Sequence, residues 1–522
     1  MPVSGEAALT YGNSNLFPID NLEEACRTNA FDVVVVGGGG AGAAAAIEAA
    51  DMGASVVILE KMSTPGGSTE QSGGNIRLVL DREGSIEHYW SLCQGATPKE
   101  IIEVFVDGLL ELPEWAKSHD GELVPVAESQ NYSRWVFPSR SPGTYFPTVT
   151  GGVSVGQRAR LKPATPERER GEALWDFLSR NLSRLGVPTF VGARVSRLIE
   201  DSRRRVVGVE VEGPEGKPLR VSARKAVILC CGGFAYDPDM VRQYLGISLP
   251  AQSPPGRNAG DGVRMAQQVG ADLWHMSGVT ATVGYQFPEY GAGFHCRMPD
   301  PGFVMVDQNA RRYTCETDLK NHAAHFAMLI QDTVTGDFSR VPSYVIFDEV
   351  TRRAGHIAGL DSGENRHYPW SKDNSREIER GWITQAQTLE ELAERLGLAP
   401  KALLDTISEF NTSALEGSPD VFGRPPGLIR SIDSPPFYGA AVYPSLINTQ
   451  GGPRRDAEAA VLRPDGSVVP GLFAAGELGS IWNRLYPGAG NISECLVFGR
   501  IAGRNATRTE IAARELSEGV RI

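Results

Sequence analysis

A strand–turn–helix–strand unit near the N-terminus constrains this chain more than any other feature. Residues 31–36 read FDVVVV, a β-branched run typical of a strand buried on both faces. The GxGxxG pattern follows directly, with glycines at Gly37, Gly39 and Gly42, and then AAAAIEAADMG, which favours a helix. A second apolar strand, ASVVILE, ends at Glu60. Glycines and an acidic residue at these places in a βαβ unit indicate that it binds a dinucleotide.

Each of these positions has a physical reason. Gly37 permits a tight turn, Gly39 lets the backbone approach a pyrophosphate, and Gly42 allows the helix to lie close to the strand. The start of the helix offers N–H groups and a positive dipole end to phosphates. Glu60 can accept hydrogen bonds from ribose hydroxyls. The alternative is a glycine-rich turn without a ligand, which would require neither the flanking strands nor the acid.

A membrane span is the other explanation for the apolar stretch, because residues 33–50 are almost uncharged. The glycines cluster at one point, however, and Glu48 and Asp51 follow quickly, which favours a turn between a strand and a helix. The first twenty residues have neither a cationic start nor an apolar core. We therefore expect neither a membrane span nor a signal peptide.

Charge and cysteine content exclude further classes. The chain has 522 residues, with 51 Lys and Arg against 63 Asp and Glu, and a formal net charge of −12. This acidic balance argues against a nucleic-acid partner or an anionic membrane surface. Seven cysteines without a CxxC pair fit neither a metal site nor a disulfide framework. We therefore expect no metal, and a reducing, cytoplasmic location.

Two further patterns indicate a flavin. Residues 66–74 read GGSTEQSGG, and a second glycine-rich stretch so near the first indicates backbone that passes beside a large flat ligand. Near the other end, NISECLVFGRIAG predicts a final long helix that begins at about Asn491. The N-terminus of that helix would present positive dipole, which the pyrimidine edge of a reduced, anionic flavin requires.

Together these motifs resemble the FAD-dependent fumarate reductase and 3-ketosteroid dehydrogenase superfamily. The resemblance also includes AVILCCGGFAYDPDMVRQYLG, AGDGVRMAQQVGA, NTQGG, GLFAAGE and YPGAG, and it extends over residues 31–506. It implies an α/β fold, in which a Rossmann-type FAD-binding domain with a doubly wound parallel sheet is formed by residues 1–277 and 440–522. An inserted α+β capping domain, residues 278–439, would close over the flavin. Within it we expect a strand in VPSYVIFDE and helices in LEELAERLG and APKALLDTISEFNTSALEG.

The resemblance also implies which residues hold FAD. The first βαβ unit would bind the pyrophosphate and ribose, the second glycine stretch the flavin ring, and the start of the final helix its pyrimidine edge. The expected residues are Gly37, Gly39, Ala41, Gly42, Glu60, Lys61, Gly67, Ser68, Thr69, Gly73, Gly74, Val195, Asp261, Gly476, Glu477, Asn491, Ile492 and Ser493. Relatives of the succinate dehydrogenase type carry a flavin-linking His just before the GG of the second stretch. This stretch contains no His, which implies noncovalent FAD.

Catalysis is expected at the YPGAG segment. In ketosteroid dehydrogenases a similar segment places a tyrosine hydroxyl and a glycine N–H on the substrate carbonyl, which implies these roles for Tyr486 and Gly490. Two donors on a carbonyl oxygen stabilise enolate character and acidify the adjacent C–H. Fumarate reductases have a substrate-binding Arg at this point, and Arg484 matches it. The alternative for Tyr486 is a turn in which it only packs against the helix.

Proton transfer is expected in RRYTCETDLKNHAAH. By resemblance the proton shuttle would be Lys320, where the two branches of the superfamily have Arg or Tyr, and partial burial could lower its pKa. His322 and His325 are rivals, and a solvated helix surface is the alternative for the whole segment. Tyr145, in the aromatic and Pro-rich stretch RWVFPSRSPGTYFPTVTGG, could line the pocket or assist the base, unless that stretch is a plain surface loop.

These residues favour α,β-dehydrogenation of a small-molecule cyclic ketone, such as a 3-ketosteroid or a related cyclohexanone, with hydride transfer to flavin N5. Asn448 stands where fumarate reductases have a dicarboxylate-binding His, which argues against fumarate. The alternatives are reduction of an α,β-unsaturated carboxylate gripped by Arg484 and Arg77, and a noncatalytic flavoprotein. No haem or iron–sulfur motif is present, so we expect an external electron acceptor such as oxygen, a quinone or a carrier.

Overall fold

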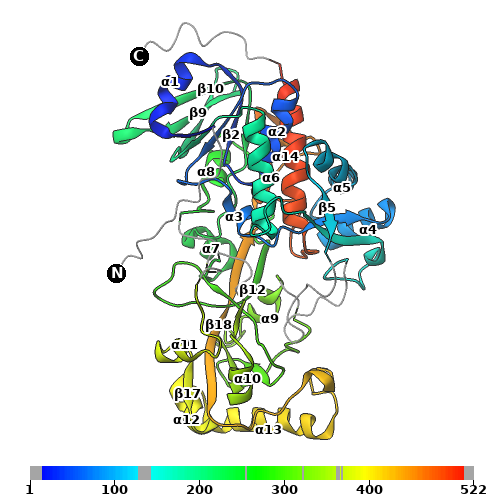
Figure 1. Ribbon diagram of the computed structural model, residues 1–522, viewed down its shortest axis with the longest axis vertical. Helices are drawn as coiled ribbons and strands as arrows, with labels where there is room; N and C mark the ends of the chain where they lie inside the picture. Colours follow the sequence, from blue (N-terminus) through cyan, green and yellow to red (C-terminus); the bar gives the residue numbers. More distant parts are fainter. Residues whose placement is uncertain are drawn as a thin grey trace.

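The computed structural model describes residues 15–126, 143–252, 256–319, 322–359, 365 and 368–510. Its largest sheet has nine strands and is mainly parallel (Figure 1). The main path runs β1, β7, β3, β2, β10, β21, β20, and the antiparallel pair β8 and β9 joins it at β10. The strands are β1 (Leu16–Pro18), β2 (Phe31–Val36), β3 (Val56–Glu60), β7 (Thr189–Val191), β8 (Val195–Glu200), β9 (Val206–Glu212), β10 (Pro218–Leu229), β20 (Ala460–Leu462) and β21 (Val468–Ala474). The predicted doubly wound α/β fold is confirmed.

The central strands are apolar on both faces because helices cover both. In β2, Val33 and Val35 belong to one hydrophobic core, and Val34 and Val36 belong to the core on the opposite face. Such a strand needs no polar alternation, which explains the sequence FDVVVV. Helices α2, α5, α6 and α14 contribute to the first core, and α7 and α8 to the second. The helices of this lobe are α1 (Leu22–Thr28), α2 (Gly40–Asp51), α3 (Gly67–Glu70), α4 (Arg82–Cys93), α5 (Lys99–Ser118), α6 (Arg170–Arg184), α7 (Pro238–Leu245), α8 (Asp261–Gln268) and α14 (Gly490–Arg508).

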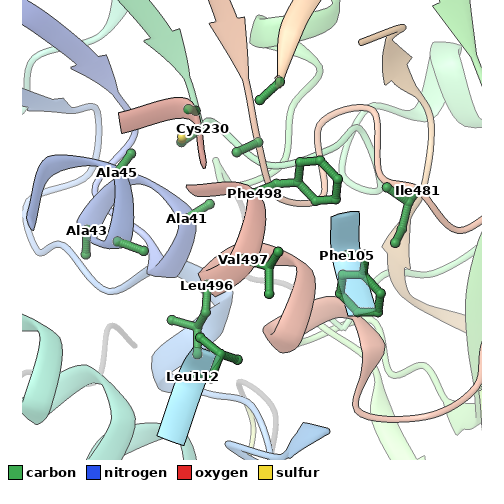
Figure 2. Packing of buried hydrophobic residues seen from close by; sticks show 14 of the residues in the cluster. Ala41, Ala43, Ala45, Phe105, Leu112, Cys230, Ile481, Leu496, Val497 and Phe498 are labelled. Atoms are coloured by element: carbon green, nitrogen blue, oxygen red, sulfur yellow. The ribbon is translucent and has the colours of Figure 1, made fainter. Parts of the chain in front are cut away.

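Helices α2 and α14 come from opposite ends of the chain and pack side by side (Figure 1). A Cβ atom added at Gly499 would lie 2.6 Å from the carbonyl oxygen of Ala41, and one at Gly503 would lie 2.2 Å from that of Ala45. Only glycine therefore allows the two backbones to approach this closely. Figure 2 shows side chains that surround this contact: Ala41, Ala43, Ala45, Leu496, Val497 and Phe498.

A second sheet of seven strands builds the other lobe. Its main order is β14, β15, β18, β12, β13, β16, with β17 also paired to β18. The long strand β18 extends from this lobe toward the first (Figure 1). It spans residue 440, the predicted domain boundary, and pairs within the second sheet along its length. The division of the chain at residues 277 and 440 stays a prediction. The strands are β12 (Val279–Tyr285), β13 (Phe294–Cys296), β14 (Phe303–Val306), β15 (Ser343–Asp348), β16 (Ala358–Gly359), β17 (Thr384–Ala386) and β18 (Phe437–Thr449).

Buried charges fix the start of the segment that leads to His322. Arg312 Nη2 lies 2.6 Å from Glu316 Oε2 and 2.7 Å from Asp420 Oδ2, and all three side chains are buried. Arg424 is also buried here and donates to the carbonyl oxygen of Phe303 at 2.7 Å. Removing one partner of a buried ion cluster would leave an uncompensated buried charge, so the cluster favours a single geometry. These ion pairs thereby fix the position of the RRYTCE stretch, from which the chain continues to His322.

The elements predicted in the second lobe are confirmed. VPSYVIFDE forms β15, and the two helical stretches form α12 and α13, the latter ending at Gly417 with a φ of +61°. In the part of the chain that the structure describes, no helix combines the length and the apolar character that crossing a bilayer requires. The other elements are α9 (Ala324–Met328), α10 (Glu349–Ala354), α11 (Ser375–Glu379), α12 (Leu389–Leu396), α13 (Pro400–Glu416), and the short strands β4 (Ile76–Val79), β5 (Leu123–Pro125), β6 (Val155–Leu161), β11 (Leu273–Trp274) and β19 (Gly452–Pro453).

We expect Gly503→Ala to destabilise the protein by about 1–3 kcal/mol, because the new methyl would force α14 away from α2. Thermal unfolding of the purified protein measures the effect. Gly427→Ala is the matched control, since a Cβ there meets no atom within 4 Å and the backbone has no positive φ. Equal melting temperatures for the two variants would contradict the close helix contact.

Candidate active site

A large cavity lies at the carboxyl ends of the parallel strands, where α/β sheets bind their ligands. Its lining includes Val36 at the end of β2, Glu60 at the end of β3, and Cys230 and Gly476 just after β10 and β21. Every predicted cofactor residue lines it except Gly42 and Ser493. Tyr145, His322 and Tyr486 line it too, so one cavity joins the expected cofactor and catalytic positions.

The three glycines of the first turn differ in what surrounds them. Gly37 has a φ of +103°, which L side chains rarely adopt. A Cβ on Gly42 would lie 2.0 Å from the carbonyl oxygen of Gly37 and 3.2 Å from Val35 Cγ1, so Gly42 lets the helix approach the strand. A Cβ on Gly39 would meet no atom closer than 3.9 Å and would project into open space at the start of α2. That space suits a pyrophosphate, which would approach the backbone where a side chain would otherwise stand.

Glu60 connects the end of β3 to this turn. Its Oε2 accepts the N–H of Gly38 at 2.7 Å, and its Oε1 accepts the N–H of Met62 at 2.8 Å. A carboxylate oxygen accepts more than one hydrogen bond, so the predicted role toward ribose hydroxyls is compatible with both contacts. Glu60 therefore lines the cavity and also holds the backbone around it in place.

A charged cluster holds the start of α8 at the part of the cavity that Glu60 also lines. Lys61 Nζ lies 2.7 Å from Asp261 Oδ2, and Arg194 Nη2 lies 2.9 Å from Asp261 Oδ1. Burial alone would raise the pKa of Asp261, but its hydrogen bonds to Lys61 and Arg194 hold that pKa below the usual value. The carboxylate is therefore ionised at neutral pH and fixes the loop that carries Val195.

Glu477 is a buried carboxyl group beside the predicted ribityl position. Its Oε1 accepts the backbone N–H of Thr449 at 3.1 Å. Gly233 leaves room for it, since a Cβ there would lie 2.4 Å from Glu477 Oε1. Burial raises the pKa of Glu477 to about 7, although hydrogen bonds from Thr449 and Gly233 act to lower it. Hydroxyl groups of a ribityl chain would supply the donors that the ionised form needs.

The start of α14 orients Tyr486. The Tyr486 hydroxyl accepts the backbone N–H of Asn491 at 3.3 Å, so its own proton points elsewhere. Asn491 Nδ2 donates in turn to Asn448 Oδ1 at 2.8 Å, and Gln450 Nε2 donates to Asn491 Oδ1 at 3.3 Å. Asn448 also accepts from the Thr280 hydroxyl. Asn448 is therefore engaged in contacts within the protein, through which it positions Asn491.

Arg77 supports the YPGAG turn from behind. Its side chain is buried, and Nη2 donates to the carbonyl oxygens of Pro487, at 3.2 Å, and of Gly488. Its backbone N–H donates to Ser493 Oγ at 2.8 Å. A Cβ on Gly488 would lie 2.9 Å from the ring of Tyr145, so this glycine admits the tyrosine. Because its Nη2 bonds to the turn and Arg77 does not line the cavity, its expected contact with a substrate carboxylate gains no support.

Three rings meet beside this turn. The Tyr145 and His322 rings are stacked with centroids 5.6 Å apart, and Tyr145 Oη lies 3.2 Å from His322 Nδ1. The His322 and Tyr486 centroids are 5.4 Å apart. The carbonyl oxygen of His322 accepts the N–H of Ala281, which attaches it to β12. Lys320 lies outside the described residues, so its role as proton shuttle stays a prediction.

Besides Gly42 and Arg77, four predicted residues that the structure describes do not line the cavity: His325, Arg484, Gly490 and Ser493. Arg484 is exposed, and its guanidinium lies 5.6 Å from the centroid of the Phe326 ring. His325 is buried behind it; burial and the charge of Arg484 lower its pKa to about 4, so it is neutral at pH 7. Gly490 packs against the Trp482 ring, which a Cβ would approach to 2.7 Å, and Ser493 donates to the carbonyl oxygen of Ala489. The predicted roles of these four residues gain no support from the geometry.

Sequence reasoning missed Arg257, which lines the cavity next to the second glycine stretch. Its Nη1 donates to the carbonyl oxygen of Gly67 at 3.3 Å, and a Cβ on Gly67 would lie 3.4 Å from Gly39 Cα. Its Nε is buried and has no hydrogen-bond partner among the described residues. The buried Nε of Arg257 is a cationic donor close to the open space at Gly39, and such a donor fits a pyrophosphate. These residues therefore fit FAD. Nothing in the local sequence marked Arg257, because the contact joins residues 190 positions apart.

We expect Arg257→Met to weaken FAD binding roughly 10- to 100-fold, because a charge-assisted contact to the pyrophosphate is lost. Titration of the apoprotein with FAD, followed by flavin fluorescence, measures the dissociation constant. Riboflavin, which lacks phosphates, should bind both proteins equally. Arg242→Met, which removes an exposed arginine paired with Asp239, is the control. Equal loss of FAD and riboflavin binding would place Arg257 elsewhere on the cofactor.

The raised pKa of Glu477 predicts a pH dependence of the apoprotein. The folded carboxyl titrates at about 7 and the unfolded one near 4.5, so the folded state binds the proton more tightly. Stability is unaffected below the lower value and falls as pH rises from about 4.5 to 7. The loss is at most about 3 kcal/mol. We expect Glu477→Gln to flatten this part of a plot of melting temperature against pH, and an unchanged slope would contradict the assignment.

Comparisons with known proteins agree with this geometry. Residues 32–492 match the family model described as "FAD binding domain". The 3-oxosteroid 1-dehydrogenase of Mycolicibacterium smegmatis is 28% identical over 93% of this chain and 98% of its own length. The 4-oxocyclohexanecarboxylate 2-dehydrogenase of Sinomonas cyclohexanicum is 26% identical over 91% and 92%. The crystal structure of a 3-ketosteroid delta1-dehydrogenase from Sterolibacterium denitrificans shares the fold, with a TM-score of 0.78 and 20% identity over 92% of this chain and 100% of that one. The chain belongs to this FAD-binding family and is an FAD-dependent oxidoreductase.

Proposed function

We propose that this enzyme desaturates a cyclic ketone between the carbons α and β to its carbonyl group. The observation that carries the proposal is the group formed by Tyr486, His322 and Tyr145 on the wall of the FAD cavity. It combines a hydroxyl donor for a carbonyl oxygen with an imidazole that can take a proton. Both relatives named above are dehydrogenases of ring ketones by their names, which supports the same class of substrate.

Tyr486 would polarise the ketone. Because its oxygen accepts the Asn491 N–H at the N-terminus of α14, the helix stabilises negative charge on that oxygen and strengthens the hydroxyl as a donor. A hydrogen bond to the ketone oxygen favours the enolate and thus lowers the pKa of the α C–H. Arg77 and Gly488 hold the turn behind the tyrosine, so the donor is fixed before the substrate binds.

His322 would remove the α proton. With Nδ1–H donating to the Tyr145 oxygen, the other ring nitrogen is left as the proton acceptor. The electron pair of the broken C–H bond forms the new double bond as the β hydrogen departs. Bound FAD would supply the acceptor for that hydrogen, which leaves as hydride. Lys320 could serve as the base in place of His322, or relay the proton onward.

Reduction of an α,β-unsaturated carboxylate is the second candidate. This reaction would need Arg484 and Arg77 to bind the carboxylate. Arg484 is exposed, and the guanidinium of Arg77 bonds to the YPGAG turn, so neither arginine supports it. A dye-reduced enzyme that converts simple unsaturated acids but oxidises no ring ketone would favour it.

Noncovalent FAD, an external acceptor such as oxygen, a quinone or a carrier, and a cytoplasmic location belong to the same proposal. The segment at α3 offers no His for a covalent link. All seven cysteines are free thiols, in keeping with a reducing compartment.

We expect anaerobic addition of 3-ketosteroids or substituted cyclohexanones to bleach the oxidised flavin, and Tyr486→Phe to slow the bleaching roughly 100- to 1,000-fold. Stopped-flow absorbance of the flavin gives the rate. Tyr443→Phe, on β18 and away from the cavity lining, is the matched control. Both variants should retain FAD. Failure of every ring ketone to bleach the wild-type flavin would sink the proposed function.

A further inference from the structure

A buried histidine that the proposed chemistry does not use contacts the loop that carries Tyr145. His88 belongs to α4, its side chain is fully buried, and it does not line the cavity. Its Nδ1 lies 3.1 Å from the carbonyl oxygen of Thr150, and its Nε2 lies 3.0 Å from Thr144 Oγ1. One imidazole ring therefore joins both sides of this loop to the helix.

The two contacts determine which nitrogen of His88 carries its proton. Burial lowers the pKa of His88 and outweighs the contacts with the carbonyl oxygens of Thr150 and Val149, which act to raise it, so the ring is neutral at pH 7. A carbonyl oxygen only accepts, so Nδ1 carries the proton and donates to Thr150. Nε2 is then an acceptor, and the hydroxyl group of Thr144 donates to it.

Thr144 in turn fixes the backbone around Tyr145. Its hydroxyl oxygen accepts the N–H of Phe146 at 3.2 Å, which closes a turn with Tyr145 at its centre. The N–H of Tyr145 donates to the carbonyl oxygen of Pro487 at 3.1 Å. Because the proton of the Thr144 hydroxyl is directed to His88, its oxygen keeps a lone pair for Phe146. The backbone of Tyr145 is thus held on both sides.

A glycine allows the same loop to lie close against α4. Gly151 has a φ of +73°, and a Cβ there would lie 2.1 Å from the carbonyl oxygen of Gly84 and 2.9 Å from the backbone nitrogen of His88. Ser85 Oγ donates to the carbonyl oxygen of Ser154 at 3.1 Å. The segment from residue 144 to residue 154 is therefore held by α4 at several points.

Tyr145 connects this support with the second lobe. Its hydroxyl oxygen lies 3.2 Å from His322 Nδ1, and the two rings are stacked. The hydrogen-bond partner of one imidazole nitrogen fixes the orientation of the ring and the nitrogen that carries its proton. A displacement of Tyr145 would therefore change the ring that the proposed desaturation uses as its base.

We propose that His88 is a positioning residue, which acts through Thr144 to hold Tyr145 against His322; its effect on the rate rests on the proposed desaturation. A neutral imidazole fits this place because it offers one donor and one acceptor, which match the Thr150 carbonyl and the Thr144 hydroxyl. A histidine that only filled space in the core would need neither polar contact.

The first test observes the His322 ring without turnover. NMR of the oxidised holoenzyme with isotopically labelled nitrogen in its eight histidines gives imidazole signals, and those that His322→Gln removes belong to His322. We expect Thr144→Val to shift these signals in the direction in which Tyr145→Phe shifts them. Thr144→Ser keeps the hydroxyl group and should retain the wild-type signals. Unchanged signals in Thr144→Val would overturn the inference.

Thr148→Val is the matched control, because it removes the same hydroxyl group from an exposed position of the same loop. FAD content and melting temperature identify a misfolded variant. If Thr144→Val is misfolded, His88→Asn carries the comparison, since its amide can still donate to Thr150 whereas Thr144 loses its acceptor. It should shift the His322 signals in the same direction, and unchanged signals would again overturn the inference.

The rate of flavin reduction measures the catalytic consequence. With a ring ketone that bleaches the wild-type flavin, we expect Thr144→Val to slow anaerobic bleaching roughly 10- to 100-fold, while the ketone concentration at half the maximal rate stays nearly unchanged. Thr144→Ser and Thr148→Val should bleach at the wild-type rate. An unchanged rate in Thr144→Val would overturn the catalytic part of the inference. If no ring ketone bleaches the wild-type flavin, the desaturation fails, and the His322 signals still decide whether His88 and Thr144 position Tyr145.

Discussion

The contact between α2 and α14 is the constraint on which the site depends. Gly499 stands against Ala41 and Gly503 against Ala45, so the two helices run in the same direction. Helix α14 begins nine residues before Gly499, which carries its N-terminus about 12 Å beyond that of α2 at the helical rise of 1.5 Å per residue. Two positive helix ends thus face one cavity at different points along it. An elongated dinucleotide with charge at its pyrophosphate and at its ring matches that arrangement better than a compact ligand.

The cofactor half of the site was predictable because its chemistry is local. Gly37, Gly39 and Gly42 lie within one turn, and the strands on either side set their geometry. The contribution of Arg257 was not predictable, because its proximity to Gly67 arises only when the loop before α8 folds over the first turn. Local pattern thus identified most of the predicted cofactor residues that line the cavity, whereas the position of Arg257 follows only from the three-dimensional fold.

The catalytic half shows why residues close in sequence separate in space. Arg484 and Tyr486 are two positions apart, yet one is exposed over Phe326 and the other lines the cavity. His322 and His325 divide in the same way, since His322 has a φ of +71° in an irregular turn and His325 lies in the short helix α9. In a helix or strand the spacing tells which residues share a face. In a turn it does not, so the sequence indicated which segments reach the cavity but not which of their side chains line it.

The two lobes divide the work in a way that follows from these contacts. The donor to the ketone is fixed by the cofactor lobe, since Arg77 and the start of α14 hold the Tyr486 turn from behind. Other residues of the cavity lining come from the second lobe, among them His295 on β13 and Arg297 just after that strand. Changes in β13 or β16 can therefore alter which ring is accepted without moving the hydroxyl that activates it. His322 is attached to β12 of the second lobe, so the proposed donor and the proposed base rest on different lobes and the reaction needs both in register.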